Sequence, residues 1–121
     1  MLFNIERIEE NDDSYIFFTN STPVTISKAF GTPGEAVWSD QTLIILFNEI
    51  DRKDNIAAFS PEGKEIWRLP PGEVSTKEGL KEINYSGLGI SKGKIGCSTF
   101  WGRTYDIDVT SGKRKFVGVT K

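Results

Sequence analysis

The sequence predicts an all-β protein, in which an antiparallel meander of about ten short strands forms a compact sandwich or open barrel. Short apolar or alternating runs recur along the chain between turn residues, and these runs are rich in β-branched and aromatic side chains. A length of 121 residues is close to the commonest domain size, so we expect a single domain spanning residues 1–121. The expected strands lie near Leu2–Ile8, Ser14–Asn20, Val24–Ala29, Ala36–Ser39, Thr42–Asn48, Asn55–Ser60, Lys64–Leu69, Ile83–Ile90, Lys94–Phe100, Arg103–Val109 and Lys113–Thr120.

The turns between these runs have recognisable chemistry. In Ser60-Pro61-Glu62-Gly63 the proline fixes φ for the second turn position and the glycine suits a left-handed one, which predicts a type I turn closed by a bulge. The stretch Val109-Thr110-Ser111-Gly112-Lys113 predicts the same geometry, so Gly63 and Gly112 are both expected at positive φ. Further hairpin turns are expected at Glu10–Asp13, Ser39–Gln41 and Ser91–Gly93.

One segment, residues 70–82, breaks the strand pattern. It begins with two prolines, which end the preceding strand. Ser75 and Glu78 have the spacing of a capping box, so at most one short helix is expected, near Ser75–Lys81. Gly79 makes this helix marginal, because glycine inside a helix costs about 1 kcal/mol relative to alanine.

The two glycine turns also suggest an internal repeat. Aligning Gly63 with Gly112 gives an offset of 49 residues, which lies within the period of propeller blades, and sets Trp67 against Phe116. Two unrelated hairpins with the same favoured turn would produce the same match, so both explanations remain open.

The composition excludes several classes of function. The chain has no histidine and one cysteine, which removes Ser-His-Asp and Cys-His catalysis and the usual zinc sites. We therefore expect no catalytic residues, no cofactor and no metal, although a mechanism that uses carboxylates alone remains open. The longest apolar run, Leu43–Phe47, is too short to span a bilayer, and a lone Cys97 fits a cytoplasmic protein. The pI near 5.2 argues against nucleic-acid binding.

The charges are divided unevenly along the chain. Residues 1–60 carry ten acidic and four basic side chains, a net charge of −6, whereas residues 61–121 carry a net charge of +4. The acidic side chains of the first half cluster in two predicted turns, which are either solvated turns or a landing surface for a basic protein. Trp101 and Tyr105, beside Arg103, are either core residues or apolar anchors for a partner. The candidate partner-binding residues are Glu9, Glu10, Asp12 and Asp13 in one predicted turn, Glu49, Asp51 and Asp54 in another, and Trp101 and Tyr105.

Two hairpins carry a resemblance to a known family. The stretches Phe59-Ser60-Pro61-Glu62-Gly63-Lys64-Glu65-Ile66-Trp67 and Thr104-Tyr105-Asp106-Ile107-Asp108-Val109-Thr110-Ser111-Gly112-Lys113, with the ending Phe116-Val117-Gly118-Val119-Thr120-Lys121, resemble small β-rich immunity proteins of bacterial polymorphic toxin systems, including contact-dependent growth inhibition. This sequence departs from the pattern at Ser60-Pro61, where an acidic residue is usual, and at Ser111 before Gly112.

The resemblance implies a cytoplasmic, non-enzymatic protein that binds a cognate toxin domain, frequently a nuclease, covers its active site and is monomeric until bound. It assigns no individual partner-binding residue. The competing interpretation is a stand-alone β-domain that binds a small ligand or has a structural role, since exposed aromatic residues could line a cleft. An enzyme is the third possibility.

Overall fold

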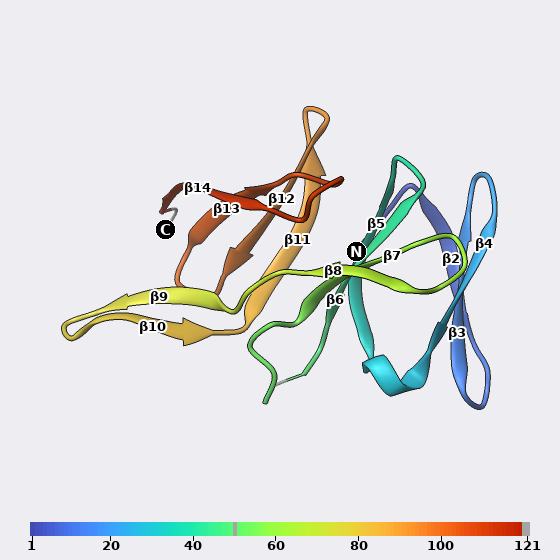
Figure 1. Ribbon diagram of the computed structural model, residues 1–121, viewed down its shortest axis with the longest axis horizontal. Coiled ribbons are helices and arrows are strands. Elements are labelled where there is room, and N and C mark those ends of the chain that lie inside the picture. Colours follow the sequence, from blue (N-terminus) through green and yellow to red (C-terminus); the bar gives the residue numbers. More distant parts are fainter. Residues whose placement is uncertain (50, 120–121) are drawn as a thin grey trace.

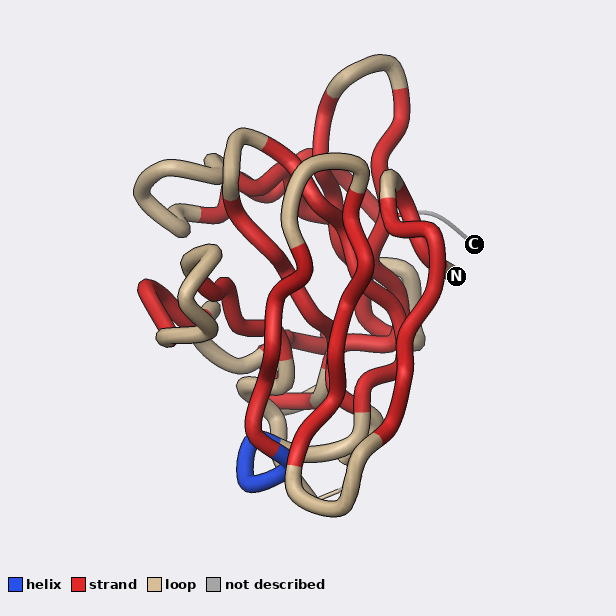
Figure 2. Tube along the Cα trace, turned by 90° about the vertical axis from the view of Figure 1, so that its right-hand side faces the viewer, coloured by secondary structure: helices blue, strands red, loops and turns tan. Residues whose placement is uncertain are grey.

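The computed structural model describes residues 1–49 and 51–119. Nearly all regular structure in these residues is strand, with a single 3₁₀ turn, η1 (Lys28–Phe30) (Figure 2). The strands are β1 (Leu2–Phe3), β2 (Ile5–Glu10), β3 (Ser14–Thr19), β4 (Pro23–Ser27), β5 (Pro33–Ser39), β6 (Thr42–Phe47), β7 (Ile56–Phe59), β8 (Glu65–Arg68), β9 (Gly72–Thr76), β10 (Gly79–Ile83), β11 (Tyr85–Ser91), β12 (Lys94–Thr99), β13 (Arg103–Ile107) and β14 (Arg114–Val119).

Three antiparallel meanders stack face to face (Figure 1). The N-terminal sheet has the order β2-β3-β4, the middle sheet β1-β5-β6-β7-β8 and the C-terminal sheet β11-β12-β13-β14. The short β1 runs parallel to β5, and every other pairing is antiparallel. Strands β9 and β10 form a separate hairpin that projects from the body (Figure 1). The predicted all-β class with antiparallel meanders is confirmed, and the sandwich has three layers.

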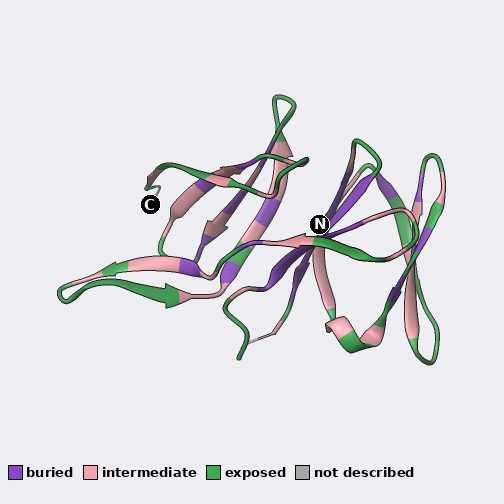
Figure 3. Ribbon diagram, in the orientation of Figure 1, coloured by how far each residue is buried: buried purple, intermediate pink, exposed green. Residues whose placement is uncertain are grey.

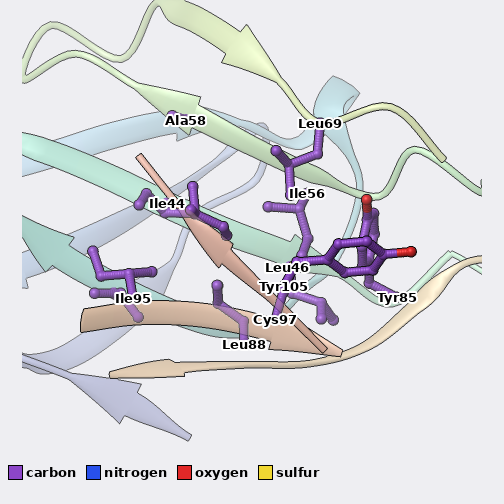
Figure 4. Packing of buried hydrophobic residues seen from close by; sticks show 12 residues of the cluster. Ile44, Leu46, Ile56, Ala58, Leu69, Tyr85, Leu88, Ile95, Cys97 and Tyr105 are labelled. Atoms are coloured by element: carbon purple, nitrogen blue, oxygen red, sulfur yellow. The ribbon is translucent and has the colours of Figure 1, made fainter. Parts of the chain in front are cut away.

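The middle sheet is covered on both faces, and its sequence reflects this. Every residue of β6 is buried, which explains the continuous apolar run Leu43–Phe47 (Figure 3). Alternate side chains point to opposite faces of a strand, so Ile44 and Leu46 pack toward the C-terminal sheet while Leu43 and Ile45 pack toward the N-terminal sheet. Figure 4 shows the core between the middle and C-terminal sheets, in which Ile44 and Leu46 pack with Leu88, Ile95 and Cys97.

The predicted turns are confirmed. Asp40 and Gln41 have φ values of 50° and 58° in the β5–β6 turn, and Lys92 and Gly93 have 52° and 77° in the β11–β12 turn. Two consecutive positive φ values define the type I′ hairpin turn, whose twist matches that of the flanking strands.

Gly63 and Gly112 both have positive φ, 80° and 73°, as predicted. The N–H of Gly63 donates to Ser60 O at 2.9 Å, whereas that of Gly112 donates to Asp108 O at 2.8 Å. The second turn therefore spans one residue more, and the expectation that both turns have the same geometry is wrong. Hairpins β7–β8 and β13–β14 are each the last two strands of a four-strand meander. The 49-residue offset therefore relates equivalent places in two sheets, as an internal repeat requires.

The expected short helix near Ser75–Lys81 is wrong, because this segment forms the β9–β10 hairpin. Thr76 Oγ1 accepts from the Glu78 N–H at 3.2 Å and donates to Gly79 O at 2.7 Å, which closes the turn. Gly79 has a φ of 110°, a conformation that serves this turn and does not fit a helix.

The end of one predicted strand also differs from expectation. The predicted strand Val24–Ala29 stops at Ser27, whose hydroxyl accepts from the Ala29 N–H and starts η1. Thr120, the last residue of the predicted strand Lys113–Thr120, lies outside the described residues, as does Lys121 of the family-like ending.

Candidate partner-binding surface

The two acidic segments, far apart in the sequence, lie on either side of η1 at one end of the molecule. The β2–β3 turn, η1 and the β6–β7 loop all lie at the lower end in Figure 1. Lys28 at the start of η1 joins η1 to the first segment, since its N–H donates to Asp13 O at 2.9 Å and its ammonium lies 2.6 Å from Glu10. Glu49 of the second segment accepts from the Thr32 N–H, just after η1, at 3.1 Å. We call this end the acidic surface; its carboxylates are Glu9, Glu10, Asp12, Asp13, Glu49, Asp51 and Asp54.

Some of these carboxylates are held by cations. Arg7 pairs with Glu9 at 3.1 Å, and Arg52 pairs with Asp54 at 2.8 Å. Partial burial raises the pKa of Asp54, but the hydrogen bond and charge of Arg52 outweigh it and leave that pKa below its usual value. The hydrogen bond to Glu10 raises the pKa of Lys28, so this ammonium remains charged at neutral pH.

Asp12, Asp13 and Asp51 are exposed and make no ion pair with any described residue. Their charge is therefore available to an approaching cation, whereas Glu9, Glu10 and Asp54 each already have a partner. A shallow hollow of about 460 Å³ lies between η1 and the second acidic segment. It is lined by Lys28, Ala29, Phe30, Gly31, Glu49, Asp51 and Arg52.

The acidic residues differ in the rigidity of their setting. Glu9 and Glu10 belong to strand β2 and not to the turn where the sequence placed them; Asp12 and Asp13 form the turn itself. Asp51 lies in the irregular β6–β7 loop. A strand holds its side chains in fixed directions, so Glu9 and Glu10 have better-defined positions than the carboxylates of a free loop.

The two predicted aromatic anchors behave differently. Trp101 lies in the β12–β13 turn and is 65% exposed, with its ring edge-on to Phe100. Tyr105 is only 2% exposed, so the expectation that it serves as a surface anchor is wrong. Tyr105 shares the inward face of β13 with Ile107 and packs edge-on against Tyr85, because residues two apart on a strand share a face (Figure 4).

Sequence reasoning missed a polar network behind these tyrosines. Arg114 belongs to the edge strand β14, and its guanidinium turns inward and donates to Pro71 O at 2.7 Å and to the Tyr85 hydroxyl. It also pairs with Glu73 at 3.4 Å. Burial raises the pKa of Tyr85, despite the opposing charge of Arg114. Arg114 lies directly opposite Ile107, and such cross-strand neighbours point to the same face of the sheet. The alternation of side chains along β13 is the sequence signal that could have revealed the inward direction of Arg114.

This network fastens β14 to the segment before β9. It contains two guanidinium groups, those of Arg103 and Arg114, with two phenols and one carboxylate. Cys97 is the cross-strand neighbour of Tyr105. The contacts of this network are those of a structural clamp.

Cys97 is buried at 3% exposure inside the core between the middle and C-terminal sheets. This burial raises the pKa of its thiol to about 12, because the thiolate loses hydration there. We expect the folded protein to react with a disulfide reagent such as DTNB at pH 8 at least about 100-fold more slowly than the urea-unfolded chain does. Equal rates in the two states would show that Cys97 is accessible.

The same shift makes stability depend on pH. The thiol of the unfolded chain ionises near pH 8.5, well below the folded pKa, so the unfolded state gains charge first as pH rises. The contribution of Cys97 to the free energy of unfolding is therefore fully present below about pH 8 and declines toward pH 12. Urea titrations at a series of pH values should show a shallower decline for Cys97→Ala, and an unchanged slope would contradict this assignment.

Residues 1–49 and 51–119 hold no group of three or more His, Cys, Asp or Glu side chains placed to bind a metal ion. The same residues contain no helical segment with the length and hydropathy that a bilayer crossing requires. Comparison of the chain with known protein families, curated proteins and solved structures finds no match.

Proposed function

We propose that this chain is a cytoplasmic immunity protein that binds a cognate bacterial toxin domain, a nuclease in the favoured case, and covers its active site with the acidic surface. The observation that carries the proposal is the convergence of two acidic segments on η1, although 38 residues separate Asp13 from Asp51 in the sequence. The family resemblance of hairpins β7–β8 and β13–β14 supports it, and both hairpins lie in the framework away from the acidic surface (Figure 1).

The chemistry of the partner follows from the charge of this surface. A nuclease acts on a polyanion, so its active-site cleft is electropositive, and an inhibitor that covers it does best with carboxylates in place of phosphates. Asp12, Asp13 and Asp51, which have no ion pair with a described residue, would pair with basic groups of the toxin. Glu9, Glu10 and Asp54, each beside its own cation, would shape the rim of the contact.

The first experiment uses the product of the gene immediately upstream, which the proposal predicts to carry the cognate toxin domain. A pull-down should recover the complex, and kinetics at low salt should show association that slows as salt rises. The triple variant Asp12→Lys, Asp13→Lys, Asp51→Lys should associate about 10-fold more slowly or worse. Its thermal stability should stay near that of the wild type, since exposed charges contribute only about 0–1 kcal/mol each.

A matched control is available in Glu62, Glu78 and Glu82, which are equally exposed but lie in the β7–β8 turn and the β9–β10 hairpin. Reversing these three changes the net charge by the same amount and should leave association within about twofold of the wild type. Equal slowing of both triple variants would reduce the effect to net charge and remove the acidic surface as the interface. No complex with the toxin domain would remove the immunity assignment.

The proposal also predicts no turnover by this chain alone. Hydrolysis of nucleotides, esters or glycosides by the pure protein, abolished by one carboxylate substitution, would replace the proposal with an enzyme. Binding of a small ligand with no protein partner would favour the stand-alone β-domain.

A further inference from the structure

Large apolar side chains remain exposed on one corner of the C-terminal sheet. They come from the β12–β13 turn and from the edge strand β14, which pairs with β13. The residues are Phe100, Trp101, Phe116, Val117 and Val119. The Phe100 and Trp101 rings are in edge-on contact, and contiguous apolar patches on a protein surface mark interaction sites.

A groove of about 410 Å³ runs between this corner and the projecting β9–β10 hairpin. One wall is strand β9, and the other combines the turn, the start of β13 and the end of β14. The lining residues are Val74, Ser75, Thr76, Trp101, Arg103 and Val119.

Arg103 gives the groove a charge preference. Its Cζ lies 4.0 Å from the centre of the Phe116 ring, and its Nε donates to the Tyr105 hydroxyl at 3.2 Å. Unlike Arg114, which pairs with Glu73, Arg103 makes no ion pair with any described residue. A guanidinium has five N–H donors in a planar fork, so the remaining donors fit a carboxylate.

Strand β9 offers backbone as well as side chains. Among residues 1–49 and 51–119, β9 pairs with β10 alone, so no described strand is hydrogen-bonded to its other edge. Glu73 O accepts from Thr99 Oγ1 across that other edge, and backbone groups two residues apart point to the same edge, so the Ser75 N–H and C=O face the groove. A two-stranded hairpin is marginal in water, and a third strand would stabilise it.

We propose that this groove binds an extended segment of a protein partner, which adds as a third strand along β9. The segment places an apolar side chain between Trp101 and Val119 and a carboxylate on Arg103. Backbone pairing gives such strand addition its affinity, while the apolar and charged contacts give specificity. This site lies beyond the proposed function: its charge preference is opposite to that of the acidic surface, and its test needs no toxin.

The test is a selection from a displayed library of random dodecapeptides on the immobilised full chain. Recovered peptides should combine a large apolar residue with Asp or Glu one or two positions away, as a strand that reaches both Trp101 and Arg103 requires. Trp101→Ala and Arg103→Gln should each weaken binding of a selected peptide at least about 10-fold, as for the central contacts of an interface. Replacing the peptide's own acid by its amide should weaken binding to the wild type but should hardly change binding to Arg103→Gln.

Matched controls separate the groove from the rest of the surface. Ile66→Ala removes an apolar side chain that is 50% exposed on β8, and Lys94→Gln removes an exposed cation on β12; neither should change peptide affinity. Trp101 lies in an exposed turn, so its variant stays folded even if Arg103→Gln does not. Amide shifts in NMR spectra should locate the peptide at β9 and the β12–β13 turn.

Three outcomes would overturn the proposal. They are a selection that enriches no acidic-apolar sequence, peptides that bind Trp101→Ala as well as the wild type, and shifts confined to another surface. Self-association of the wild type that Trp101→Ala abolishes would assign the groove to a second copy of the chain instead.

Discussion

Replacing Asn55 with leucine should lower the free energy of unfolding by about 3–5 kcal/mol, because it leaves three buried backbone groups without a partner. Asn55 is 1% exposed. Its Nδ2 donates to Phe47 O and to Tyr85 O, each at 3.0 Å, and its Oδ1 accepts from the Tyr85 N–H at 2.7 Å. One side chain thus joins the end of β6 to the start of β11, across the middle and C-terminal sheets.

Urea denaturation measures this effect through the midpoint at constant slope. Asn20→Leu is the control: Asn20 is an exposed asparagine in the β3–β4 turn, and its replacement should change stability by less than about 0.5 kcal/mol. A loss below about 1 kcal/mol for Asn55→Leu would mean that water or a rearranged backbone satisfies the three groups.

Gly63→Val should destabilise the protein by about 2–5 kcal/mol, for two separable reasons. Gly63 has a φ of 80°, and a side chain in that conformation costs about 1–2 kcal/mol. A Cβ atom there would also lie 2.1 Å from Thr25 O, a backbone atom of β4, so the turn would have to move off the N-terminal sheet. Overpacking of this kind adds about 1–3 kcal/mol.

Gly93→Val separates the two contributions. Gly93 has a φ of 77°, nearly that of Gly63, but nothing lies within 4 Å of the Cβ it would gain. This variant should show the conformational penalty alone, and the difference between the two variants measures how tightly the β7–β8 turn packs on β4. Equal losses would show that the turn does not contact β4 in solution.

Gly112→Val extends the comparison to the equivalent turn of the C-terminal sheet. Its Cβ would lie 2.5 Å from the Trp67 ring, which is a side chain and can move more easily than backbone. Moving Trp67 would break its hydrogen bond to Val109 O, now 2.7 Å long, so the loss should lie between those of Gly93→Val and Gly63→Val.

Much of the secondary structure could be read from the sequence because it depends on local pattern. Runs such as Leu43–Phe47 and the glycines at 63 and 112 determine strands and left-handed turn positions through sterics within a few residues. The hairpin β9–β10 was missed because capping spacing at Ser75 and Glu78 competed with strand-forming Val74 and Thr76, and the turn geometry prevailed.

The candidate site was only partly predictable. The acidic residues could be named, because charge is a property of composition. Their assembly around η1 could not, because it depends on which sheet edges face one another. The alternation on β13 could not tell which face is inward, so the sequence left Tyr105 open between core and surface. The structure buries Tyr105 and leaves Trp101 exposed.

The sequence by itself therefore determined the all-β class, the hairpin turns and the acidic residues, since each depends on neighbours along the chain. Only the tertiary structure decided the three-layer stack, the burial of Asn55 and Arg114 among backbone carbonyls, and the placement of two distant acidic segments beside η1. Packing between sheets selects these contacts from many strand arrangements with the same local pattern, and a pattern with a period of two residues carries no record of which sheets will face each other.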